Sequence, residues 1–363
     1  WHQQHTAAAA WIGQEDRARQ TILTMAEYQT PEGAIPNFYT NGDIHRPFGG
    51  TNQYYFWQVL NHWLLTADRD LLEQVAPVLD RTLAQTLREY DSDGDLVISW
   101  GTQIGNQEDF VSTPYNGTAP TVEAINMLKT RALVAKALGD TATEQRCTAM
   151  ANVADARMKE QLWLPDLGRF AWYRDPQGVA RLDGVYQTYI YPVIYGHLNP
   201  LDSWTNMRHL RDRLMDDEGA VYASNHYADH LQDDWPTWGM QAGAAQQPWG
   251  AWGLADVGLN NEAWRPLAAV AGWVNDDYNR GSWPEVAHEA RLGYFSPPAA
   301  LYVQATIEAI FGLRLNRPEN TLTISPAIPD AWDRARLGLP DFQVDYTRTG
   351  NLITMDVTTS DPF

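Results

Sequence analysis

Two pairs of carboxylates lie in polar, aromatic stretches where they could perform acid–base chemistry. Glu108 and Asp109 lie in SWGTQIGNQEDF, and Glu285 and Glu289 lie in GSWPEVAHEA. Hydrolysis of a glycosidic bond needs two carboxyl groups, one protonated to donate to the leaving oxygen and one ionised to activate water or attack carbon. Burial beside an aromatic ring raises the pKa of the acid, whereas polar surroundings keep the base charged. The two pairs are therefore candidates for the acid and the base of a glycosidase.

Tryptophans accompany these carboxylates. The chain has 16 Trp and 17 Tyr, and several tryptophans lie in polar or turn-like stretches. The apolar face of a pyranose stacks on such a ring while neighbouring polar groups bind the hydroxyls. For any single tryptophan, packing at the end of a helical core is the alternative. The set of candidate substrate-binding residues is Trp100, Trp235, Trp238, Trp283, Asn106, Gln107, His288 and Glu289.

The bulk composition excludes several classes of partner. The 363 residues carry a formal net charge of −19, whereas a phosphate backbone or an anionic membrane surface needs a basic protein face. No apolar run approaches the length of a membrane span. The single cysteine, Cys147, excludes an internal disulfide and a cysteine-based metal site. We therefore predict neither a nucleic-acid partner nor a membrane partner, and the localisation stays open.

One acidic turn raises the question of a metal. Asp91, Asp93 and Asp95 in DSDGDL resemble half of a calcium loop, but position 102 is Thr where a bidentate Glu would be needed. Histidine pairs at helical spacing lack the H-E-x-x-H pattern of zinc enzymes. We therefore predict no metal and no cofactor, and we interpret the acidic stretch as a solvated turn.

Helical periodicity dominates the sequence. Asp68 and Asp140 (or Thr141) are typical N-caps, and Gly139 and Gly312 are typical residues at helix ends. The connections alternate between short ones and long ones, which is typical of helical hairpins arranged in a ring with all long loops at one rim. The ten predicted helices lie at 2–28, 51–65, 68–90, 118–139, 141–162, 186–198, 201–215, 236–255, 259–279 and 297–313.

This pattern predicts an all-α fold, an (α/α)6 toroid. A closed ring of six hairpins needs twelve helices, so about two N-terminal helices are missing from the chain or from this count. After 314 the sequence alternates with period 2 in three segments, which predicts strands. We expect residues 1–314 to form the barrel and residues 315–363 to form a short β segment packed on or beside it. GRFAWYRD and GVARL predict a hairpin inserted in one loop.

Four stretches resemble the six-hairpin glycosidases, the superfamily of glucoamylase-like, glycogen-debranching-type, trehalase-like and rhamnosidase-like enzymes and of sugar phosphorylases. The resemblance covers about 300 residues in the same order and implies an (α/α)6 barrel, a carbohydrate substrate and an inverting mechanism with two carboxylates. The similar stretches are NQYYFWQVLNHWLLTADRDLLEQVAPVL, REYDSDGDLVISWG, YNGTAPTVEAINMLKTRAL and FSPPAALYVQATIEAIFGLRL with LTISPAIPDAWD.

The resemblance also implies roles for individual residues. Glu108 matches the general acid, and Asp109 is then a ligand of a sugar hydroxyl, or the acid itself if the register differs by one. Glu285 matches the base in the loop before the last helix. The acid loop GNQEDF follows no single member's signature, so the sugar does not transfer. Members usually carry a β-sandwich before the barrel, so a missing N-terminal β domain, or strands from a partner chain, stays open.

Three functions remain as hypotheses. The first is a glycoside hydrolase that cleaves an exo-linked sugar. The second is a sugar phosphorylase on the same barrel, for which the cationic groups near the base are few: His288, Arg291 and Arg280. The third is a non-catalytic glycan-binding protein that keeps the tryptophans. Phosphate dependence separates the first two, and loss of activity without loss of sugar binding on removal of Glu285 separates the third.

Overall fold

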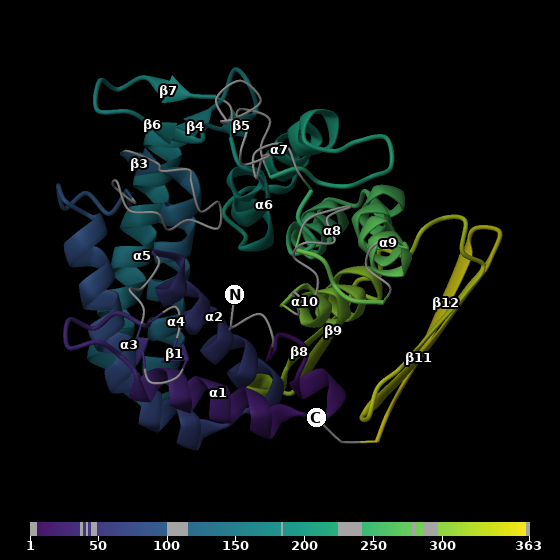
Figure 1. The fold of residues 1–363 in the computed structure, drawn as a ribbon, viewed down its shortest axis with the longest axis horizontal. Helices are drawn as coiled ribbons and strands as arrows, with labels where there is room; N and C mark the ends of the chain where they lie inside the picture. The colour runs from purple at the N-terminus through teal and green to yellow at the C-terminus, as the bar shows by residue number, and fades with distance from the viewer. Residues whose placement is uncertain are drawn as a thin grey trace.

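The chain folds into a ring of helices with β-strands at its C-terminal end (Figure 1). The computed structural model describes residues 6–36, 39–40, 43–44, 49–99, 115–182, 184–223, 242–277, 281–285 and 297–360. Within these residues the helices are α1 (Glu15–Glu27), α2 (Gly49–Thr66), α3 (Arg69–Tyr90), α4 (Thr118–Leu138), α5 (Thr141–Leu162), α6 (Tyr186–Ile194), α7 (Pro200–Arg213), α8 (Gln246–Asp256), α9 (Asn260–Asn275) and α10 (Pro297–Ala305). A π-helical turn, Thr306–Ile310, continues α10.

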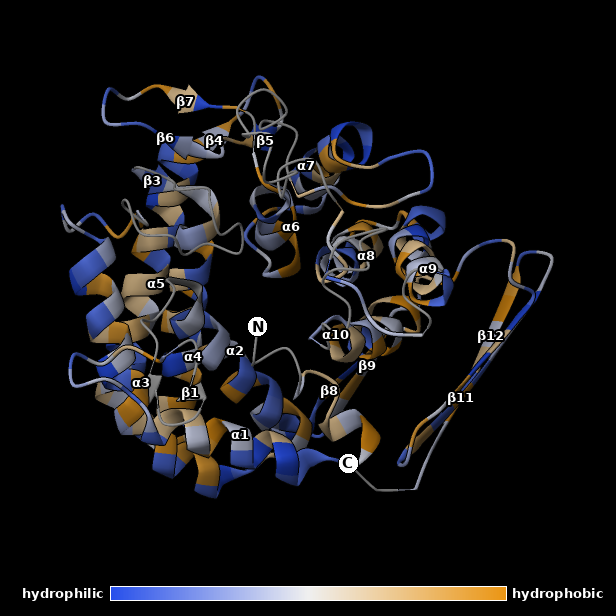
Figure 2. Ribbon diagram, in the orientation of Figure 1, coloured by the Kyte–Doolittle hydropathy of each residue, from blue (hydrophilic) through white to orange (hydrophobic). Residues whose placement is uncertain are grey.

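The helices form two concentric layers. The even-numbered helices contact one another in chain order, α2 with α4, α4 with α6, α6 with α8 and α8 with α10, so they form the inner layer. The odd-numbered helices pack outside them. Inner α4 is buried around most of its circumference, as expected for a helix that is apolar on all sides. Outer α3 is amphipathic, and Figure 2 shows hydrophilic and hydrophobic residues interleaved along it.

Short turns join each inner helix to the next outer helix. Four of these turns contain a left-handed residue, Ala67, Gly139, Gly196 and Gly258, whose φ angles lie between 56° and 84°. A left-handed residue ends a helix by turning its last carbonyl groups toward new donors. In two of the turns an aspartate follows directly and caps the next helix: Asp68 accepts from Leu71 and Asp140 accepts from Thr143. These turns form one rim of the ring.

Long connections lead from each outer helix to the next inner helix. They precede α2, α4, α6, α8 and α10, so the N-terminal ends of the inner helices share the opposite rim. The predicted all-α toroid, with short turns at one rim and long loops at the other, is confirmed. One long N-terminal helix, predicted for 2–28, is wrong, because Gly13 (φ 71°) separates a short 3-10 turn, Ala10–Ile12, from α1. Pro77 lies within α3 and does not interrupt it.

The strands form small antiparallel sheets. The predicted loop hairpin is present as β6 (Tyr173–Arg174) and β7 (Ala180–Arg181), and β6 also pairs with β3 (Asn116–Gly117). The predicted C-terminal strands are β9 (Thr321–Ile324), β11 (Phe342–Thr349) and β12 (Leu352–Thr359). The sequence patterns missed β8 and β10. The remaining strands are β1 (Tyr39–Thr40), β2 (Asp43–Ile44), β4 (Trp163–Leu164), β5 (Arg169–Phe170), β8 (Leu313–Asn316) and β10 (Arg334–Gly338).

The C-terminal strands share a core with the helices. β8 pairs with β9, and β10, β11 and β12 form a meander that extends beside the ring (Figure 1). Phe342 of β11 packs its ring against Trp11, and Val344 and Tyr346 are buried with it. Leu313 and Leu315 of β8 belong to the same hydrophobic cluster. The predicted domain boundary between 314 and 315 stays a prediction.

Polar side chains close the ring between the first and last inner helices. The Gln304 amide on α10 donates hydrogen bonds to Asn61 Oδ1 on α2 and to Glu308 Oε1, both at 2.9 Å. The Trp11 indole donates to the same Glu308 oxygen at 2.7 Å. Burial raises the pKa of Glu308, and the hydrogen bonds from Trp11 and Gln304 partly offset this rise.

Candidate active site

The loop predicted to carry the acid starts and ends at the N-terminus of α4. The Gly117 amide donates to the Ile98 carbonyl at 3.0 Å, and the Ile98 amide donates to Thr121 Oγ1 on α4 at 2.9 Å. The Ser99 amide donates to the Tyr90 carbonyl at the end of α3. The residues on both sides of 100–114 are therefore fixed at the long-loop rim of an inner helix.

The segment that carries the predicted base is fixed at the same rim. The Ala244 amide, just before α8, donates to the Glu285 carbonyl at 2.9 Å. The Gly281 amide donates to the Val274 carbonyl near the end of α9 at 2.8 Å, with Gly281 in the left-handed region (φ 86°). Glu285 is half-buried. Both predicted carboxylate loops are therefore anchored at N-terminal ends of inner helices.

A buried glutamine at the start of α8 orders the neighbouring segments. The Gln247 amide donates to the Val221 and Gly243 carbonyls, both at 2.9 Å, and its oxygen accepts from the Val221 amide at 2.7 Å. Because all of these polar atoms are buried, the bonds hold residues 221 and 243 firmly against α8. The segment just before α8, to which Glu285 is hydrogen-bonded, is thus part of the packed core.

Trp283 packs against neighbouring helices close to Glu285. Its ring lies 5.4 Å from the ring of Tyr302 on α10, at an interplanar angle of 61°, and it contacts a cluster around Val270 and Trp273. Trp283 is half-buried, so part of its surface remains accessible. The other predicted site residues lie outside the described residues: Trp100, Asn106, Gln107, Glu108, Asp109, Trp235, Trp238, His288 and Glu289.

Aromatic side chains fill the interior of the ring below this rim. Trp249 on α8 contacts Trp57 on α2 at 5.7 Å and Tyr191 on α6 at 5.8 Å, measured between ring centroids. The hydroxyl groups of Tyr54 and Tyr191 lie 3.2 Å apart. The Trp57–Trp249 and Tyr54–Tyr191 contacts join α2 to α8 and α2 to α6, which are not neighbours in the ring, so they cross its interior. Trp249 and Trp252, which occur in the turn-like sequence QPWGAWG, are buried in α8.

A buried carboxyl group lies beside these aromatic side chains. Glu123 on α4 is buried, and its Oε2 accepts from the Gln53 amide on α2 at 2.6 Å. Burial raises the pKa of Glu123 to about 8, and the bond from Gln53 only partly offsets this. Glu123 is therefore largely protonated at neutral pH. Five residues into α4, it lies about 7.5 Å below the helix start at 1.5 Å per residue.

The sequence analysis missed Glu123, because the search for carboxylates was directed at loops. The available signal was a single glutamate inside the otherwise apolar stretch APTVEAINML. A charged residue is rarely buried in such a helix without a specific partner or role.

The acidic turn forms a compact cluster. Carboxylate oxygens of Asp91, Asp93 and Asp95 lie within 4.8 Å of one another. Asp93 accepts from the Tyr115 hydroxyl at 2.9 Å, and Asp95 accepts from the Gln161 amide at 2.7 Å. These bonds tie the turn after α3 to Tyr115, which precedes α4, and to Gln161 on α5.

The double-layered helical ring with long loops at one rim defines an (α/α) toroid of the type found in glycosidases. Solved structures with this fold include a sialidase, with a TM-score of 0.73 at 14% sequence identity. A GH78-family rhamnosidase from Bacillus sp. GL1 has a TM-score of 0.72 at 13% identity, and an α-L-rhamnosidase from Dictyoglumus thermophilum has 0.69 at 12%. At these identities the likeness is one of fold.

The similarity extends over 98% of this chain. The chain spans only 35% of the sialidase, 37% of the Bacillus rhamnosidase and 39% of the Dictyoglumus enzyme. No protein-family model matches the sequence, and no curated protein matches it either. Among the described helices, none has the length and apolar character needed to cross a membrane.

Proposed function

We propose that this chain is the catalytic barrel of a glycoside hydrolase that removes an exo-linked sugar with inversion. Glu108 is the general acid and Glu285 the general base, with Asp109 as a ligand of a sugar hydroxyl or as the acid in place of Glu108. Trp100, Trp235, Trp238 and Trp283 form the walls on which sugar rings stack.

One observation carries the proposal: the anchors of both carboxylate loops lie at one rim. Ile98 and Gly117 flank the acid loop at the start of α4, and Glu285 is bound to Ala244 at the start of α8. The glycosidase fold of the structural neighbours agrees with a sugar substrate. The rings of Trp57, Tyr191 and Trp249 limit the depth of the site, which favours binding of the end of a sugar chain.

In the proposed mechanism the two carboxyl groups take different roles. The acid donates its proton to the glycosidic oxygen as the bond to the anomeric carbon breaks. The base removes a proton from a water molecule, which attacks that carbon from the opposite face and inverts it. Each proton transfer contributes about 10²–10⁴-fold to the rate.

The test is hydrolysis of a panel of aryl glycosides and natural oligosaccharides, with and without phosphate. Glu285→Gln and Glu108→Gln should each lower kcat by about 10²–10⁴-fold on natural substrates. An aryl glycoside with a good leaving group should rescue Glu108→Gln but not Glu285→Gln, because only the acid assists departure. NMR of the first product should show the inverted anomer.

The matched control is Glu160→Gln on the exposed face of outer helix α5, which should leave kcat within about twofold of wild type. Loss in Asp109→Asn with normal activity in Glu108→Gln would move the acid to Asp109. Turnover that requires phosphate would replace the hydrolase by a phosphorylase. Sugar binding without turnover in the wild type would refute catalysis by this chain.

A further inference from the structure

Polar atoms without protein partners gather in one cavity of the inner layer. The cavity has a volume of about 50 Å3 and lies between α2, α4 and α6. Gln53 Oε1 and Asn126 Nδ2 face no protein partner in the described part of the chain, although Gln53 is 93% buried. Both residues line the cavity together with Glu123. Buried polar atoms are costly unless something binds them.

The three groups define the hydrogen bonds that an occupant must make. Gln53 Oε1 accepts, and Asn126 Nδ2 donates. Because Oε2 of Glu123 accepts from Gln53, its proton resides on Oε1, so this carboxylic acid also donates. A single group that both donates and accepts satisfies the set, which describes a hydroxyl group or water. The volume is enough for such a group and too small for a whole sugar ring.

We propose that Glu123, Gln53 and Asn126 form a pocket that binds one hydroxyl-bearing substituent of an uncharged sugar unit. This inference rests on the proposed function, because it assigns the pocket to the glycone of the hydrolysed substrate. Trp57 and Tyr195 line the same cavity and are only half-buried, so part of the cavity wall is accessible to solvent. A sugar bound at the rim reaches Glu123 with one of its substituents.

The charges of the pocket select for a neutral sugar. The described lining of the cavity contains no Lys, Arg or His. A carboxylate of a uronic or sialic acid would lose its hydration here without a cation to replace it, which is strongly unfavourable. It would also meet Glu123, whose ionisation it would oppose further. The pocket therefore rejects anionic glycones and accepts hydroxyl groups.

The experiment combines substrate and side-chain changes. On the neutral glycoside that the wild type hydrolyses best, each glycone hydroxyl is replaced in turn by hydrogen. One deoxy derivative should lose about 100-fold in kcat/KM with the wild type, since loss of the hydroxyl leaves buried polar groups of the pocket unpaired. Glu123→Leu should lose about 100-fold on the parent substrate but under threefold on that derivative. Glu123→Gln, which keeps a donor and an acceptor, should retain the wild-type preference.

Glu308→Gln is the matched control, because Glu308 is a buried carboxyl group with a raised pKa in the turn that continues α10 and does not line the cavity. It should retain the full deoxy penalty. If Glu123→Leu fails to fold by circular dichroism, Gln53→Leu replaces it with the same expected pattern.

The outcomes separate this inference from the proposed function. Equal deoxy penalties in all variants, or turnover confined to carboxylated glycones, would refute the pocket and leave the hydrolase intact. If the wild type hydrolyses no glycoside, the proposed function fails. Calorimetric titration with free neutral monosaccharides then tests the pocket alone: binding that Glu123→Leu weakens supports it, and binding that is absent or unchanged refutes it.

Discussion

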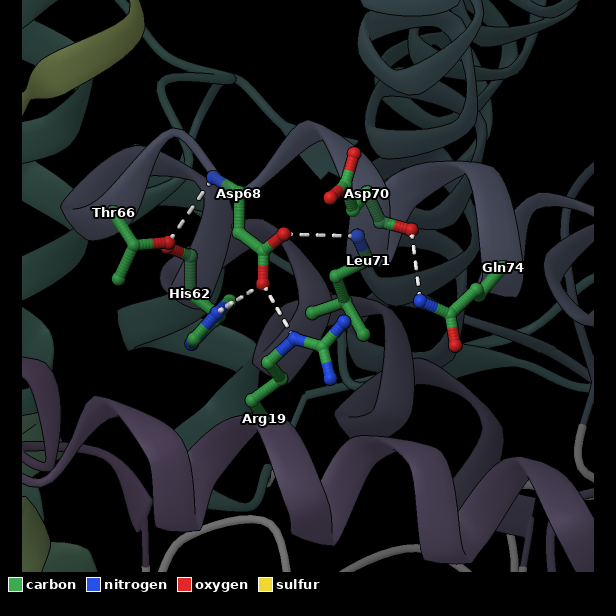
Figure 3. Close-up of polar contacts among 7 residues, drawn as sticks. All are labelled: Arg19, His62, Thr66, Asp68, Asp70, Leu71 and Gln74. Carbon is green, nitrogen blue, oxygen red and sulfur yellow. Dashed lines mark hydrogen bonds and ion pairs between the residues drawn. The ribbon is translucent and has the colours of Figure 1, made fainter.

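Removal of the Asp68 side chain should lower the free energy of unfolding, because Asp68 links three helices at the rim formed by the short turns. Asp68 links three elements (Figure 3): Oδ1 accepts from the Leu71 amide at 2.9 Å, and Oδ2 accepts from Arg19 Nε at 2.8 Å. His62 Nε2 lies 3.4 Å from the same Oδ2, and its side chain is 97% buried. Partial burial raises the pKa of Asp68, but these three partners together hold it below its ordinary value.

The expected cost of Asp68→Ala follows from these contacts. Loss of the N-cap of α3 costs about 1 kcal/mol. Leaving the buried His62 nitrogen without its acceptor costs about 1–2 kcal/mol, toward the lower end because the bond is long. The ion pair with Arg19, a third of which is exposed, adds about 0.5 kcal/mol after solvent screening. The free energy of unfolding should therefore fall by about 2–4 kcal/mol.

Urea unfolding followed by circular dichroism measures this change. Asp70→Ala is the matched control, because Asp70 lies two residues away in the first turn of α3, is exposed, and bonds to Gln74 only through its backbone oxygen (Figure 3). It should cost about 0.5 kcal/mol at most. Asp68→Asn, which keeps the cap, should lie between the two. A loss below about 1 kcal/mol in Asp68→Ala, or equal losses in Asp68→Ala and Asp70→Ala, would refute the reasoning.

Three further changes test the backbone and the buried acid. Ala67→Gly should raise the free energy of unfolding by about 0.5–1 kcal/mol, since Ala67 has φ 56°; an unchanged urea midpoint would contradict this. Gly312→Ala should lower the free energy of unfolding by more than about 3 kcal/mol, because a Cβ would lie 2.0 Å from the Ser325 carbonyl oxygen. Gly272→Ala, with open space on α9, should instead stabilise the protein, and equal effects of the two substitutions would refute this explanation. The raised pKa of Glu123 means that the native state binds more protons, so its contribution is full below pH 4.5 and is lost as pH rises to about 8. Over this range the free energy of unfolding of the wild type should fall by up to about 1.4 kcal/mol per pH unit, and Glu123→Gln should abolish this fall. The same pH dependence in both proteins would contradict the raised pKa of Glu123.

The helical architecture could be predicted because its signals are local. Asp140 caps α5 and Gly139 ends α4 with φ 84°, as their residue types indicate. Alternating connection lengths then determine which helix ends share a rim. The failures have local causes too: Gly13 interrupts the first predicted helix, and residues 242–245, predicted to be helical, precede the first turn of α8.

The interior of the ring could not be predicted, because it depends on contacts between helices far apart in sequence. Trp57 and Trp249 meet across the ring, yet nothing near either residue in the sequence indicates the partner. Glu123 shows the same limit, since its raised pKa results from burial against α2 and α6, which outweighs the lowering effect of the hydrogen bond from Gln53. Of the predicted site residues, the structure describes Glu285 and Trp283, and the roles of both remain proposals.

The bond between Asn61 and Gln304 has a consequence for biosynthesis. The two residues are 243 positions apart, so a ribosome that adds 5–20 residues per second needs roughly 12–50 s to deliver the second after the first. Throughout that interval the edge of α2 that will meet α10 is exposed to solvent or covered by a chaperone. The ring can therefore begin to form early on the nascent chain, but it can close only after α10 has been synthesised.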